Sequence, residues 1–350
     1  MKLLVSALEP SSNLHLKEVL AHTKDVELTG IFDKNIKNGT PLYDISQMAI
    51  MGVVDALKKL RWFFKVADEM VALAKDADKI LLMDSSGFNL PLAKKLKTAY
   101  PQKEIIYYIL PQIWASRPKR AIELEKYCDR LLGILPFEVT YYPHQKAAYV
   151  GHPLLDEIDV HRVEEDTKNV IAFMPGSRKS EITRLMPIFL ELRRKLGNEI
   201  RPLLVIPPSF SRDKIAKLYK GNREFEVVRN THEALKRAEF AFICSGTATL
   251  EAALIGVPFT LAYIAKKVDF FIGTKLLGIT QVGLANIILT HYNNTTLHNE
   301  ILQEEVTVDN LLKEYYNTNR EIFAKKAKEL HTYLGHGSSK NVAKIIMESL

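Results

Sequence analysis

The chain has 350 residues, of which 47% are hydrophobic and 25% charged, a composition typical of globular domains and unlike that of collagen, coiled coils or disordered chains. Its length predicts two domains or one large one. Its two cysteines, Cys128 and Cys244, show no CxxC spacing, which argues against a disulfide framework or a structural zinc site. The formal net charge of +7 favours an anionic partner, such as a phosphorylated metabolite, nucleic acid or an anionic membrane surface.

Neither a membrane span nor a signal peptide is evident in the sequence. No segment reaches the roughly 18 uninterrupted apolar residues of a spanning helix. The N-terminal apolar stretch is short and meets an acid at Glu9, which is not typical of a signal peptide. We therefore expect a cytoplasmic protein.

Short apolar runs alternate with longer amphipathic segments along the chain. The predicted strands cover residues 2–7, 26–32, 79–83, 105–109, 130–134, 148–150, 169–174, 201–205, 226–228, 240–243 and 259–263. Helical patterns lie between them, such as Ile182, Leu185 and Phe189 at helical spacing. This alternation predicts parallel sheets built from βαβ units. So many strands exceed what one compact sheet of this type holds.

A break near residues 151–167 predicts two doubly wound, Rossmann-like α/β domains. We expect the first to cover 1–155 and the second 168–320, facing across a cleft at the carboxyl ends of their sheets, where open α/β folds bind ligands. Residues 321–350 are predicted to form two helices interrupted at 335–339. These helices either pack back on the first domain or exchange between subunits.

A turn between a predicted strand and a predicted helix follows residue 243. Gly246 would let a ligand approach the backbone closely, and Ser245, Thr247 and Thr249 could offer hydroxyls to a diphosphate. Glu251, expected in the first helical turn, could accept hydrogen bonds from ribose hydroxyls. The alternative is a capped helix whose acid complements the helix dipole.

A second turn of the same kind follows the strand over 169–174. Gly176 and Ser177 stand at the helix entrance, and Arg178 could pair with phosphate through two hydrogen bonds. Alone, the segment could be a helix cap with a solvated arginine. Two such turns in one domain favour a nucleotide or sugar-nucleotide site.

Several common site motifs are absent from the sequence. There is no GxGxxG after a strand and no GxxxxGK[ST], which disfavours nicotinamide-dependent reductases and P-loop enzymes. Neither GxSxG nor HExxH occurs, and the ten histidines do not cluster at metal-ligand spacing. We therefore predict no metal site.

In the first half, Asp84 follows the strand over 79–83 and Glu9 follows the strand over 2–7. A carboxylate at such a strand end could act as general base toward a hydroxyl, or could cap the next helix.

Two basic segments also lie in the first half. Residues 58–65 combine four cations with Leu60, Trp62, Phe63 and Phe64 and contain no acid. They suit either an interfacial membrane helix or a helix packed on its own core. The second cluster, Arg117-Pro118-Lys119-Arg120, is either a phosphate or headgroup patch or a solvated face.

Taken together, these segments resemble the lipid-A-disaccharide synthases, inverting glycosyltransferases with the two-domain GT-B architecture. The resemblance runs over about residues 1–305. It is carried by residues 49–54, Asp84 with Phe88 and Asn89, Tyr108 with Pro111 and Trp114, 135–138, 151–153, Leu155 with Asp156, 175–178 with Glu181, 245–251, Asn286 and 300–303.

The resemblance implies an enzyme of lipid A biosynthesis. Such an enzyme joins UDP-2,3-diacylglucosamine to 2,3-diacylglucosamine 1-phosphate through a β-1,6 bond and releases UDP. The second domain would hold UDP, while the first would hold the acylated acceptor and meet the inner membrane peripherally from the cytoplasmic side. No cofactor and no nucleic acid are implied, and a homodimer is left open.

The resemblance also implies roles for individual residues. Asp84 matches the base for the acceptor hydroxyl, and Arg178 matches the arginine near the departing diphosphate. The nucleotide side would comprise Gly176, Ser177, Ser245, Gly246, Thr247, Ala248, Thr249, Glu251, Asn286 and Gln303. The acceptor side would comprise Glu9, Ser11, Asn89 and Trp114. The membrane-facing positions would be Val54, Leu57, Leu60, Trp62, Phe63 and Phe64.

The chain departs from the family pattern in its first loop. That loop usually reads A-G-E-x-S-G-D, whereas here Leu8, Ser12 and Asn13 replace both glycines and the final acid. These replacements predict a shifted acyl-chain preference.

Two rival functions are compatible with the same turns. The first is another GT-B enzyme, such as a sugar-nucleotide epimerase or a transferase acting on a polyprenyl-linked sugar. The second is a non-catalytic nucleotide-sugar-binding protein tethered to a membrane.

Overall fold

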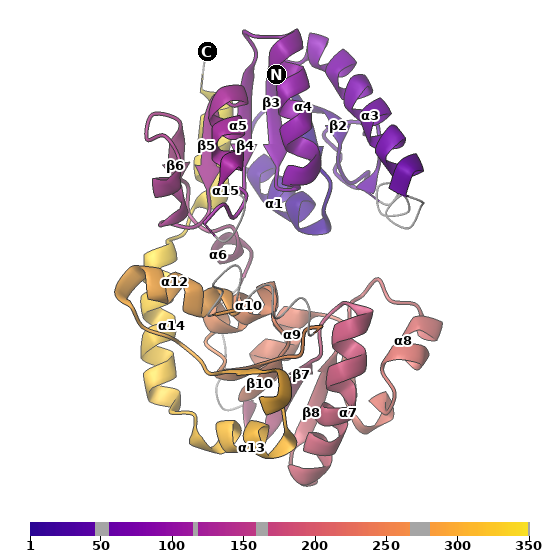
Figure 1. The fold of residues 1–350 in the computed structure, drawn as a ribbon, viewed down its shortest axis with the longest axis vertical. Coiled ribbons are helices and arrows are strands. Elements are labelled where there is room, and N and C mark those ends of the chain that lie inside the picture. The colour runs from indigo at the N-terminus through magenta and orange to yellow at the C-terminus, as the bar shows by residue number, and fades with distance from the viewer. Residues whose placement is uncertain (46–55, 115–117, 159–166, 267–280, 349–350) are drawn as a thin grey trace. The chain divides into compact units, whose positions relative to one another are not determined.

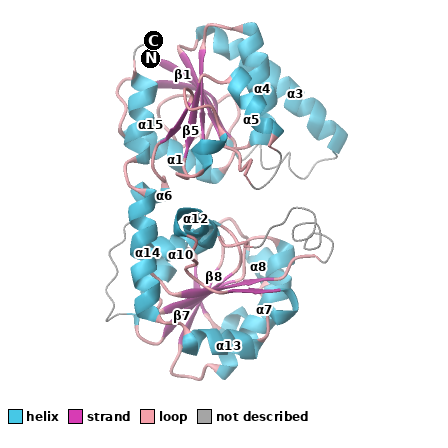
Figure 2. Cartoon of the chain, turned by 60° about the vertical axis from the view of Figure 1, so that its left-hand side comes forward, coloured by secondary structure: helices cyan, strands magenta, loops and turns pink. Residues whose placement is uncertain are grey.

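A computed structural model of the chain describes residues 1–45, 56–114, 118–158, 167–266 and 281–348. The chain forms two compact units. Unit 1 comprises Met1–Glu157 and Leu334–Leu350, and unit 2 comprises Ile158–Tyr333. Each unit contains one six-stranded sheet with helices around it (Figures 1 and 2).

The sheet of unit 1 is entirely parallel, in the order β2-β1-β3-β4-β5-β6. Its strands are β1 (Lys2–Ala7), β2 (Glu27–Ile31), β3 (Lys79–Met83), β4 (Glu104–Tyr108), β5 (Arg130–Gly133) and β6 (Ala147–Tyr149). In the middle of the sheet, Val5 pairs with Gly30 on one side and Leu81 on the other. Because the strand order reverses between β1 and β3, their carboxyl ends form the topological switch point of this unit, where such folds bind ligands.

Alternating strand residues build a core on each face of this sheet. In β3, Ile80 and Leu82 pack with one set of helices, while Leu81 and Met83 pack with the other. The first set is α3 (Ala56–Leu73), α4 (Ser86–Ala99) and α5 (Lys119–Tyr127). The second set is α1 (Pro10–Ala21) and α15 (Ser338–Met347). The last helix of the chain is thus part of the core of unit 1 (Figure 2).

The sheet of unit 2 repeats this design in the order β12-β11-β10-β7-β8-β9, again entirely parallel. Its strands are β7 (Val170–Met174), β8 (Arg201–Val205), β9 (Glu226–Val228), β10 (Phe240–Ile243), β11 (Phe259–Tyr263) and β12 (Glu300–Leu302). The order reverses between β7 and β10, where Phe242 pairs with Phe173. The switch point of unit 2 therefore lies at the carboxyl ends of these two strands.

Helices also flank both faces of the second sheet (Figure 2). One face packs against α7 (Lys179–Lys195), α8 (Arg212–Leu218) and α13 (Val308–Asn317). The other carries α9 (Thr231–Arg237), α10 (Thr247–Ile255) and α12 (Leu284–Asn293). The C-terminal segment, predicted as one piece over residues 321–350, divides between the two units. Helix α14 (Arg320–Leu334) lies in unit 2 up to Tyr333, and the residues after it join unit 1.

The predicted fold class, two doubly wound α/β domains, is confirmed by these two sheets. All eleven predicted strands are present, with ends that shift by at most one residue. β12 is not among the predicted strands, because three residues at a sheet edge are too short for a period to be recognised. Among the helices in the described part of the chain, none has the length and apolar character needed to cross a membrane.

Candidate functional site

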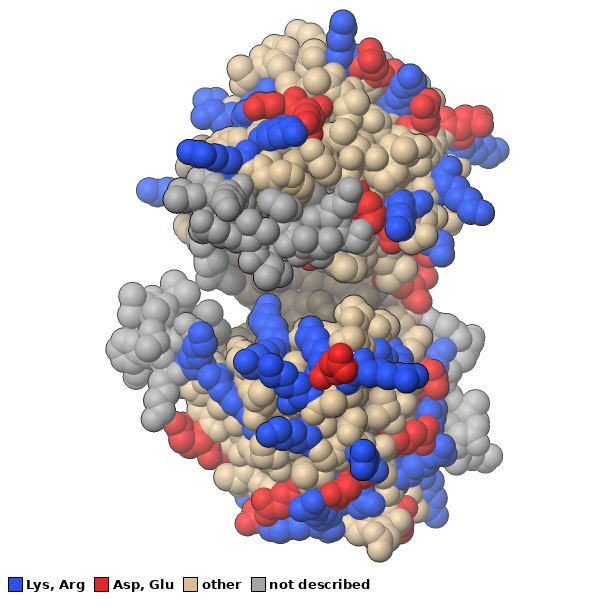
Figure 3. Space-filling model, turned by 90° about the vertical axis from the view of Figure 1, so that its right-hand side faces the viewer, with Lys and Arg blue, Asp and Glu red and all other residues tan. Residues whose placement is uncertain are grey.

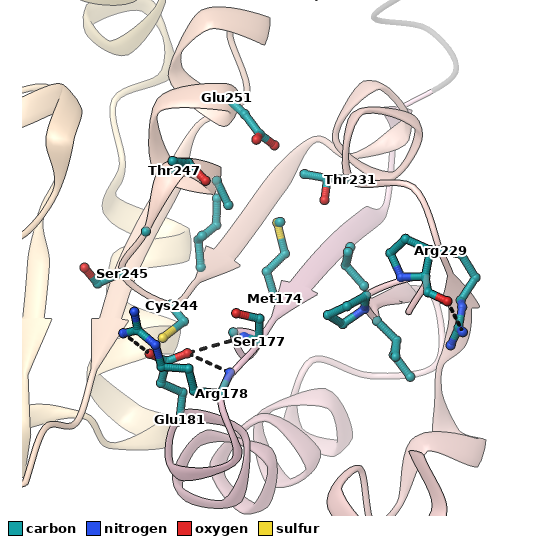
Figure 4. A pocket seen from close by; sticks show the side chains of 18 residues that line it. Met174, Ser177, Arg178, Glu181, Arg229, Thr231, Cys244, Ser245, Thr247 and Glu251 are labelled. Carbon is teal, nitrogen blue, oxygen red and sulfur yellow. Dashed lines mark hydrogen bonds and ion pairs between the residues drawn. The ribbon is translucent and has the colours of Figure 1, made fainter. Parts of the chain in front are cut away.

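A cavity of about 510 Å³ lies in unit 2, at the carboxyl ends of β7 and β10 (Figure 4). Its lining includes eight of the residues predicted on the nucleotide side or as the cation of the leaving group: Gly176, Ser177, Arg178, Ser245, Gly246, Thr247, Ala248 and Glu251. The structure thus brings together two turns that are about 70 residues apart in the sequence, at the place where the strand order reverses.

The turn between β7 and α7 is held in shape by Glu181. Its carboxylate accepts hydrogen bonds from the backbone N–H groups of Ser177, at 3.3 Å, and Arg178, at 3.1 Å. It also accepts one from Nη1 of Arg178, at 3.2 Å. The Arg178 side chain is nevertheless 79% exposed, so most of its donors are available to a ligand.

Gly176 is required by this arrangement. Its φ of +95° lies in the left-handed region, and a Cβ there would stand 2.5 Å from Oε2 of Glu181 and 3.2 Å from Sγ of Cys244. A side chain at this position would therefore displace the carboxylate that shapes the turn.

The turn between β10 and α10 leaves open space in front of the helix. Gly246 has φ +151°, and a Cβ there would meet nothing within 4 Å. No side chain caps α10, and its first turn holds no acid. Ser245 Oγ donates to the Val282 carbonyl at 3.2 Å. The first N–H groups of α10, with the helix dipole behind them, provide an environment that suits a phosphate.

Glu251 lies in the second turn of α10, which corrects the expectation of a first-turn position. Its side chain is 16% exposed and lines the cavity. Nε2 of His232, on α9, lies 3.6 Å from Oε2 of Glu251. In Figure 4, Glu251 is well separated from Arg178 and Ser245. A carboxylate at this distance from the phosphate-binding end suits a sugar hydroxyl rather than a phosphate.

Three residues predicted on the nucleotide side do not line this cavity. Thr249 is buried, and its Oγ1 donates to the Gly246 carbonyl at 2.8 Å. Asn286 Nδ2 donates to the His298 carbonyl and to Glu300, and its Oδ1 accepts from Leu297 N–H.

Gln303, with φ +55°, accepts a hydrogen bond from Ala265 N–H at 2.7 Å. The structure therefore gives all three side chains intramolecular bonds, and direct nucleotide contact by any of them stays a prediction.

The cavity is also lined by two residues that are not among the predicted site residues, Arg229 and Thr231. They follow β9 in a third strand-to-helix turn, in which Asn230 caps α9 by accepting a hydrogen bond from Glu233 N–H at 3.1 Å. Arg229 Nη2 donates to the carbonyls of Pro208 and Phe210. The available signal was the Asn cap directly after a strand.

A second cavity, of about 550 Å³, lies in unit 1 at the carboxyl ends of β1 and β3. Three charged residues, Glu9, Asp84 and Lys95, line it. Most of the remaining wall is apolar and consists of Leu8, Phe63, Phe64, Ala67, Phe88 and Pro91. This cavity therefore combines a carboxylate at a strand end with a surface that suits hydrocarbon chains.

Asp84 occupies a strained turn that its neighbours hold in place. Asp84 and Ser85 have φ values of +50° and +40°, in the left-handed region that non-glycine residues seldom adopt. The Asp84 carbonyl accepts hydrogen bonds from Tyr107 Oη, at 2.6 Å, and Asn89 Nδ2, at 2.9 Å. Asn89, buried behind the turn, also accepts a hydrogen bond from Ser6 Oγ at 2.6 Å. Asn89 thus supports the turn rather than lining the cavity.

The surroundings of Asp84 make its carboxyl group more basic. Burial raises the pKa of Asp84 above its ordinary value, while the backbone N–H of Ser85 and the charge of His15 act in the opposite direction. A carboxylate with a raised pKa accepts a proton more readily, which suits a general base.

The remaining acceptor-side predictions fall in different places. Glu9 lines the cavity of unit 1. Ser11 is exposed on the first turn of α1. Trp114 packs edge-on against Phe137 at 5.2 Å between ring centroids. Neither Ser11 nor Trp114 lines the cavity, so their contact with an acceptor stays a prediction.

The predicted membrane-facing residues belong to α3 or precede it. Val54 and the side chains of Leu57 and Leu60 lie outside the described residues. Trp62 and Phe63 are half-buried and pack against the core of unit 1. Phe64 is 52% exposed, so of the three described side chains it presents the largest free surface.

Unit 2 carries a basic surface around α8. Lys and Arg side chains gather on unit 2, the lower body in Figure 3. On α8 and directly after it, the exposed cations are Arg212, Lys214, Lys217 and Lys220. Such a surface attracts anionic ligands over a distance set by ionic strength. Within the described residues, no group of three or more His, Cys, Asp or Glu side chains could hold a metal ion.

Solved structures of other proteins share this architecture. The chain aligns over 99% of its length with UDP-GlcNAc 2-epimerase from Neisseria meningitidis bound to UDP-GlcNAc, covering 98% of that chain with a TM-score of 0.64 and 12% identity. It also aligns with MurG from Acinetobacter baumannii, covering 99% of this chain and 98% of that one with a TM-score of 0.57 and 12% identity. At this level of identity, these similarities concern the fold.

Sequence comparisons identify the family. The family model described as "Lipid-A-disaccharide synthetase" matches residues 3–348. A lipid-A-disaccharide synthase from Helicobacter pylori (strain J99) is 48% identical over 97% of this chain and 96% of its own length. Another, from Campylobacter jejuni (strain RM1221), is 44% identical over 99% of both chains. The chain therefore belongs to the lipid-A-disaccharide synthase family.

Proposed function

We propose that this chain transfers the 2,3-diacylglucosamine group of UDP-2,3-diacylglucosamine to 2,3-diacylglucosamine 1-phosphate. The product is the β-1,6-linked disaccharide 1-phosphate of lipid A biosynthesis, and UDP is released. The observation that carries the proposal is the pairing of a carboxylate with an apolar wall in the cavity of unit 1, where Asp84 stands beside Phe63, Phe64 and Phe88. An acylated sugar that offers a hydroxyl needs both features.

The cavity of unit 2 would hold the donor. Its diphosphate would lie at the start of α10 and against Arg178, because Glu181 already engages the backbone N–H groups of Ser177 and Arg178. The sources of positive potential next to these turns are the Arg178 guanidinium and the uncapped α10, whereas Arg229 donates to the carbonyls of Pro208 and Phe210. Glu251 would then accept hydrogen bonds from the ribose.

The reaction would be a single displacement that inverts the anomeric carbon. Asp84 would take the proton from the 6-hydroxyl of the acceptor as its oxygen forms a bond to the anomeric carbon of the donor. The bond from that carbon to the β-phosphate oxygen would break, and its electron pair would leave with UDP. Arg178 and α10 would stabilise the charge that develops on the leaving diphosphate.

The substrates also bear on where the enzyme works. Acyl chains gain about 0.8 kcal/mol per buried CH₂, so both lipids reside in a membrane unless a protein surface covers their chains. The exposed ring of Phe64 and the exposed cations Arg61 and Lys65 on the same helix support peripheral binding to an anionic surface, here the cytoplasmic face of the inner membrane. Assembly as a homodimer is a further prediction.

UDP release tests the proposed function. The purified chain is incubated in detergent with the donor alone and then with donor and acceptor together. We expect UDP only when both lipids are present. Release with the donor alone would favour a hydrolase or an epimerase, and binding of UDP without any release would favour a nucleotide-sugar-binding protein.

A further inference from the structure

The basic segment over residues 117–120 has no role in the function proposed so far, yet one of its cations, Arg120, is bonded to a residue that lines the cavity of unit 1. Arg120 is the second residue of α5. Its Nη1 donates a hydrogen bond to Ser86 Oγ at 2.7 Å. Ser86 begins α4 and lines the cavity that contains Asp84.

In the part of the chain that the structure describes, the positive charge of Arg120 is not balanced by a carboxylate, so it is available to an anion. Glu9 and Asp84 contribute negative charge, and Lys95, which lines the cavity, forms an ion pair with Asp68. No carboxylate among the described residues forms an ion pair with Arg120. A phosphate dianion entering a cavity with two carboxylates requires a compensating cation, because like charges at short range repel strongly.

Arg120 is suited to this task in geometry as well as in charge. A guanidinium group has five N–H donors in a planar fork, which can bind phosphate through two hydrogen bonds. The bond to Ser86 uses one donor and holds the group next to a residue of the cavity wall. Ser86 follows Asp84 by two residues, so their Cα atoms are at most about 7 Å apart. One sugar ring can therefore approach both the Asp84 carboxylate and the Arg120 guanidinium.

We propose that Arg120, positioned by Ser86, binds the phosphate monoester of the acceptor in the cavity of unit 1. The inference rests on the proposed function, since the acceptor named there carries a phosphate on its anomeric oxygen. The phosphate would lie beside Arg120 while the hydroxyl at the other end of the sugar meets Asp84. Arg120 is thus a specificity-determining residue that distinguishes the phosphorylated acceptor from its dephosphorylated form.

A phospholipid headgroup offers the same chemistry, but the position of Arg120 favours the substrate. Arg120 is half-buried and bonded to a residue of the cavity wall. Lys119, the preceding residue, is exposed. A headgroup site would need the more exposed of the two cations, whereas a substrate site needs the one that the cavity wall holds.

The test compares binding of 2,3-diacylglucosamine 1-phosphate with binding of the same lipid without phosphate. Each lipid competes with labelled acceptor for the full-length protein in detergent. We expect the wild-type protein to prefer the phosphorylated lipid by about ten- to a hundredfold, as for a charge-assisted hydrogen-bonded pair. Arg120→Ala should bring this preference close to one, Arg120→Lys should retain part of it, and Lys119→Ala should leave it unchanged.

Further measurements separate the possible failures. A thermal unfolding curve that equals that of the wild type shows that Arg120→Ala is folded. If that variant does not fold, Ser86→Ala should lower the preference several-fold by releasing the guanidinium. Equal binding of both lipids to the wild type would overturn the role of Arg120 alone, whereas binding of neither would also overturn the acceptor side of the proposed function. Binding to phosphatidylcholine vesicles with and without phosphatidylglycerol should not change in Arg120→Ala. A loss there with an intact phosphate preference would assign the arginine to headgroups and overturn the proposal.

Discussion

The two cavities occupy the same topological position in two sheets of the same design and differ in almost everything else. Each lies where the strand order reverses, between β1 and β3 in unit 1 and between β7 and β10 in unit 2. The cavity of unit 2 is lined by hydroxyls, two arginines and an uncapped helix. The cavity of unit 1 is lined by aromatic rings around one strained aspartate.

This difference separates what topology decides from what side chains decide. The reversal of strand order places an opening at the carboxyl ends in both units. The residues that follow each strand then set its chemistry. In unit 2 a buried carboxylate, Glu181, shapes the turn by accepting from backbone N–H groups. In unit 1 a buried amide, Asn89, shapes it by donating to backbone carbonyls. In both sites, therefore, a buried polar side chain stabilises the turn through hydrogen bonds to its backbone.

The largest effect on kcat is expected at Asp84 in the cavity of unit 1. Asp84→Asn should lower kcat by about a thousandfold, in the range that loss of a general base gives, while UDP binding stays at the wild-type level. Asp76→Asn, an exposed aspartate of the same unit, is the matched control. Steady-state kinetics and UDP titration measure both quantities. Turnover by Asp84→Asn near the wild-type rate would remove Asp84 as the base.

The raised pKa of Asp84 predicts opposite pH dependences for activity, which should rise with pH, and for the stability contributed by this group, which should fall with pH. Activity should fall on acidification at a higher pH than an ordinary aspartate would give, because the base must be deprotonated. Burial disfavours the charged form of Asp84 in the folded state. The free energy of unfolding should therefore decrease as the pH rises through the pKa that Asp84 has in the unfolded chain. Asp84→Asn should therefore leave Tm unchanged or raise it, and a lower Tm would contradict this account of the site.

The second-largest effect on kcat is expected at Arg178 in the cavity of unit 2. Arg178→Ala is expected to lower kcat by about a hundredfold, because stabilisation of the leaving diphosphate is lost. Lys179→Ala, which removes the adjacent exposed cation, should have little effect. If kcat fell equally in both variants, the role of Arg178 would be a general electrostatic attraction of the anionic substrate and not a specific contact of its guanidinium with the diphosphate.

A pair of glycine substitutions compares the two cavities directly. Gly176→Ala places a Cβ 2.5 Å from Glu181 at φ +95°, so UDP affinity should fall at least tenfold and Tm should drop by several degrees. Gly87→Ala in the unit 1 cavity meets nothing within 4 Å and should change neither. Calorimetry and thermal unfolding measure the difference. A Gly176→Ala variant with full UDP affinity would show that the turn tolerates another shape.

A smaller effect is expected at the membrane-facing ring. Phe64→Ala should reduce binding to anionic vesicles by several-fold without a change in Tm, since its ring is 52% exposed. Tyr316→Ala removes an aromatic ring in unit 2 that is 70% exposed and serves as control. If both variants lost vesicle binding equally, α3 would have no specific role in membrane binding.

The smallest expected effect concerns the acyl chains. Leu8 lines the unit 1 cavity at a position where the family pattern has glycine. Leu8→Gly should shift the acyl-length preference by a few-fold toward longer chains, because the cavity gains room. Rates measured over a series of acyl lengths test this, and an unchanged order of preference would contradict it.

Much of this comparison could be predicted from the sequence where the signal is local. Short apolar runs predict the strands β3, β8, β10 and β11. Small residues, mainly Gly, Ser and Thr, predict the turns that follow β7 and β10. Asp84 was predicted because a carboxylate directly follows a strand.

The rest depends on contacts between distant segments, which a local pattern does not contain. Asn286 is bonded to residues 297–300 and Asn89 to Ser6. Whether such a buried amide faces a ligand or another backbone is decided by the fold. Similarly, the aromatic run over 62–64 does not reveal that only one of its three rings is largely exposed.

Mass spectrometry of the lipid product tests the central claim most directly. The purified chain is incubated in detergent with UDP-2,3-diacylglucosamine and 2,3-diacylglucosamine 1-phosphate. We predict a single tetra-acylated disaccharide 1-phosphate, with the mass of the two substrates minus UDP, formed in equal amount to UDP. An epimerised UDP-sugar, a free diacylglucosamine, or no lipid product although both substrates bind would contradict the account.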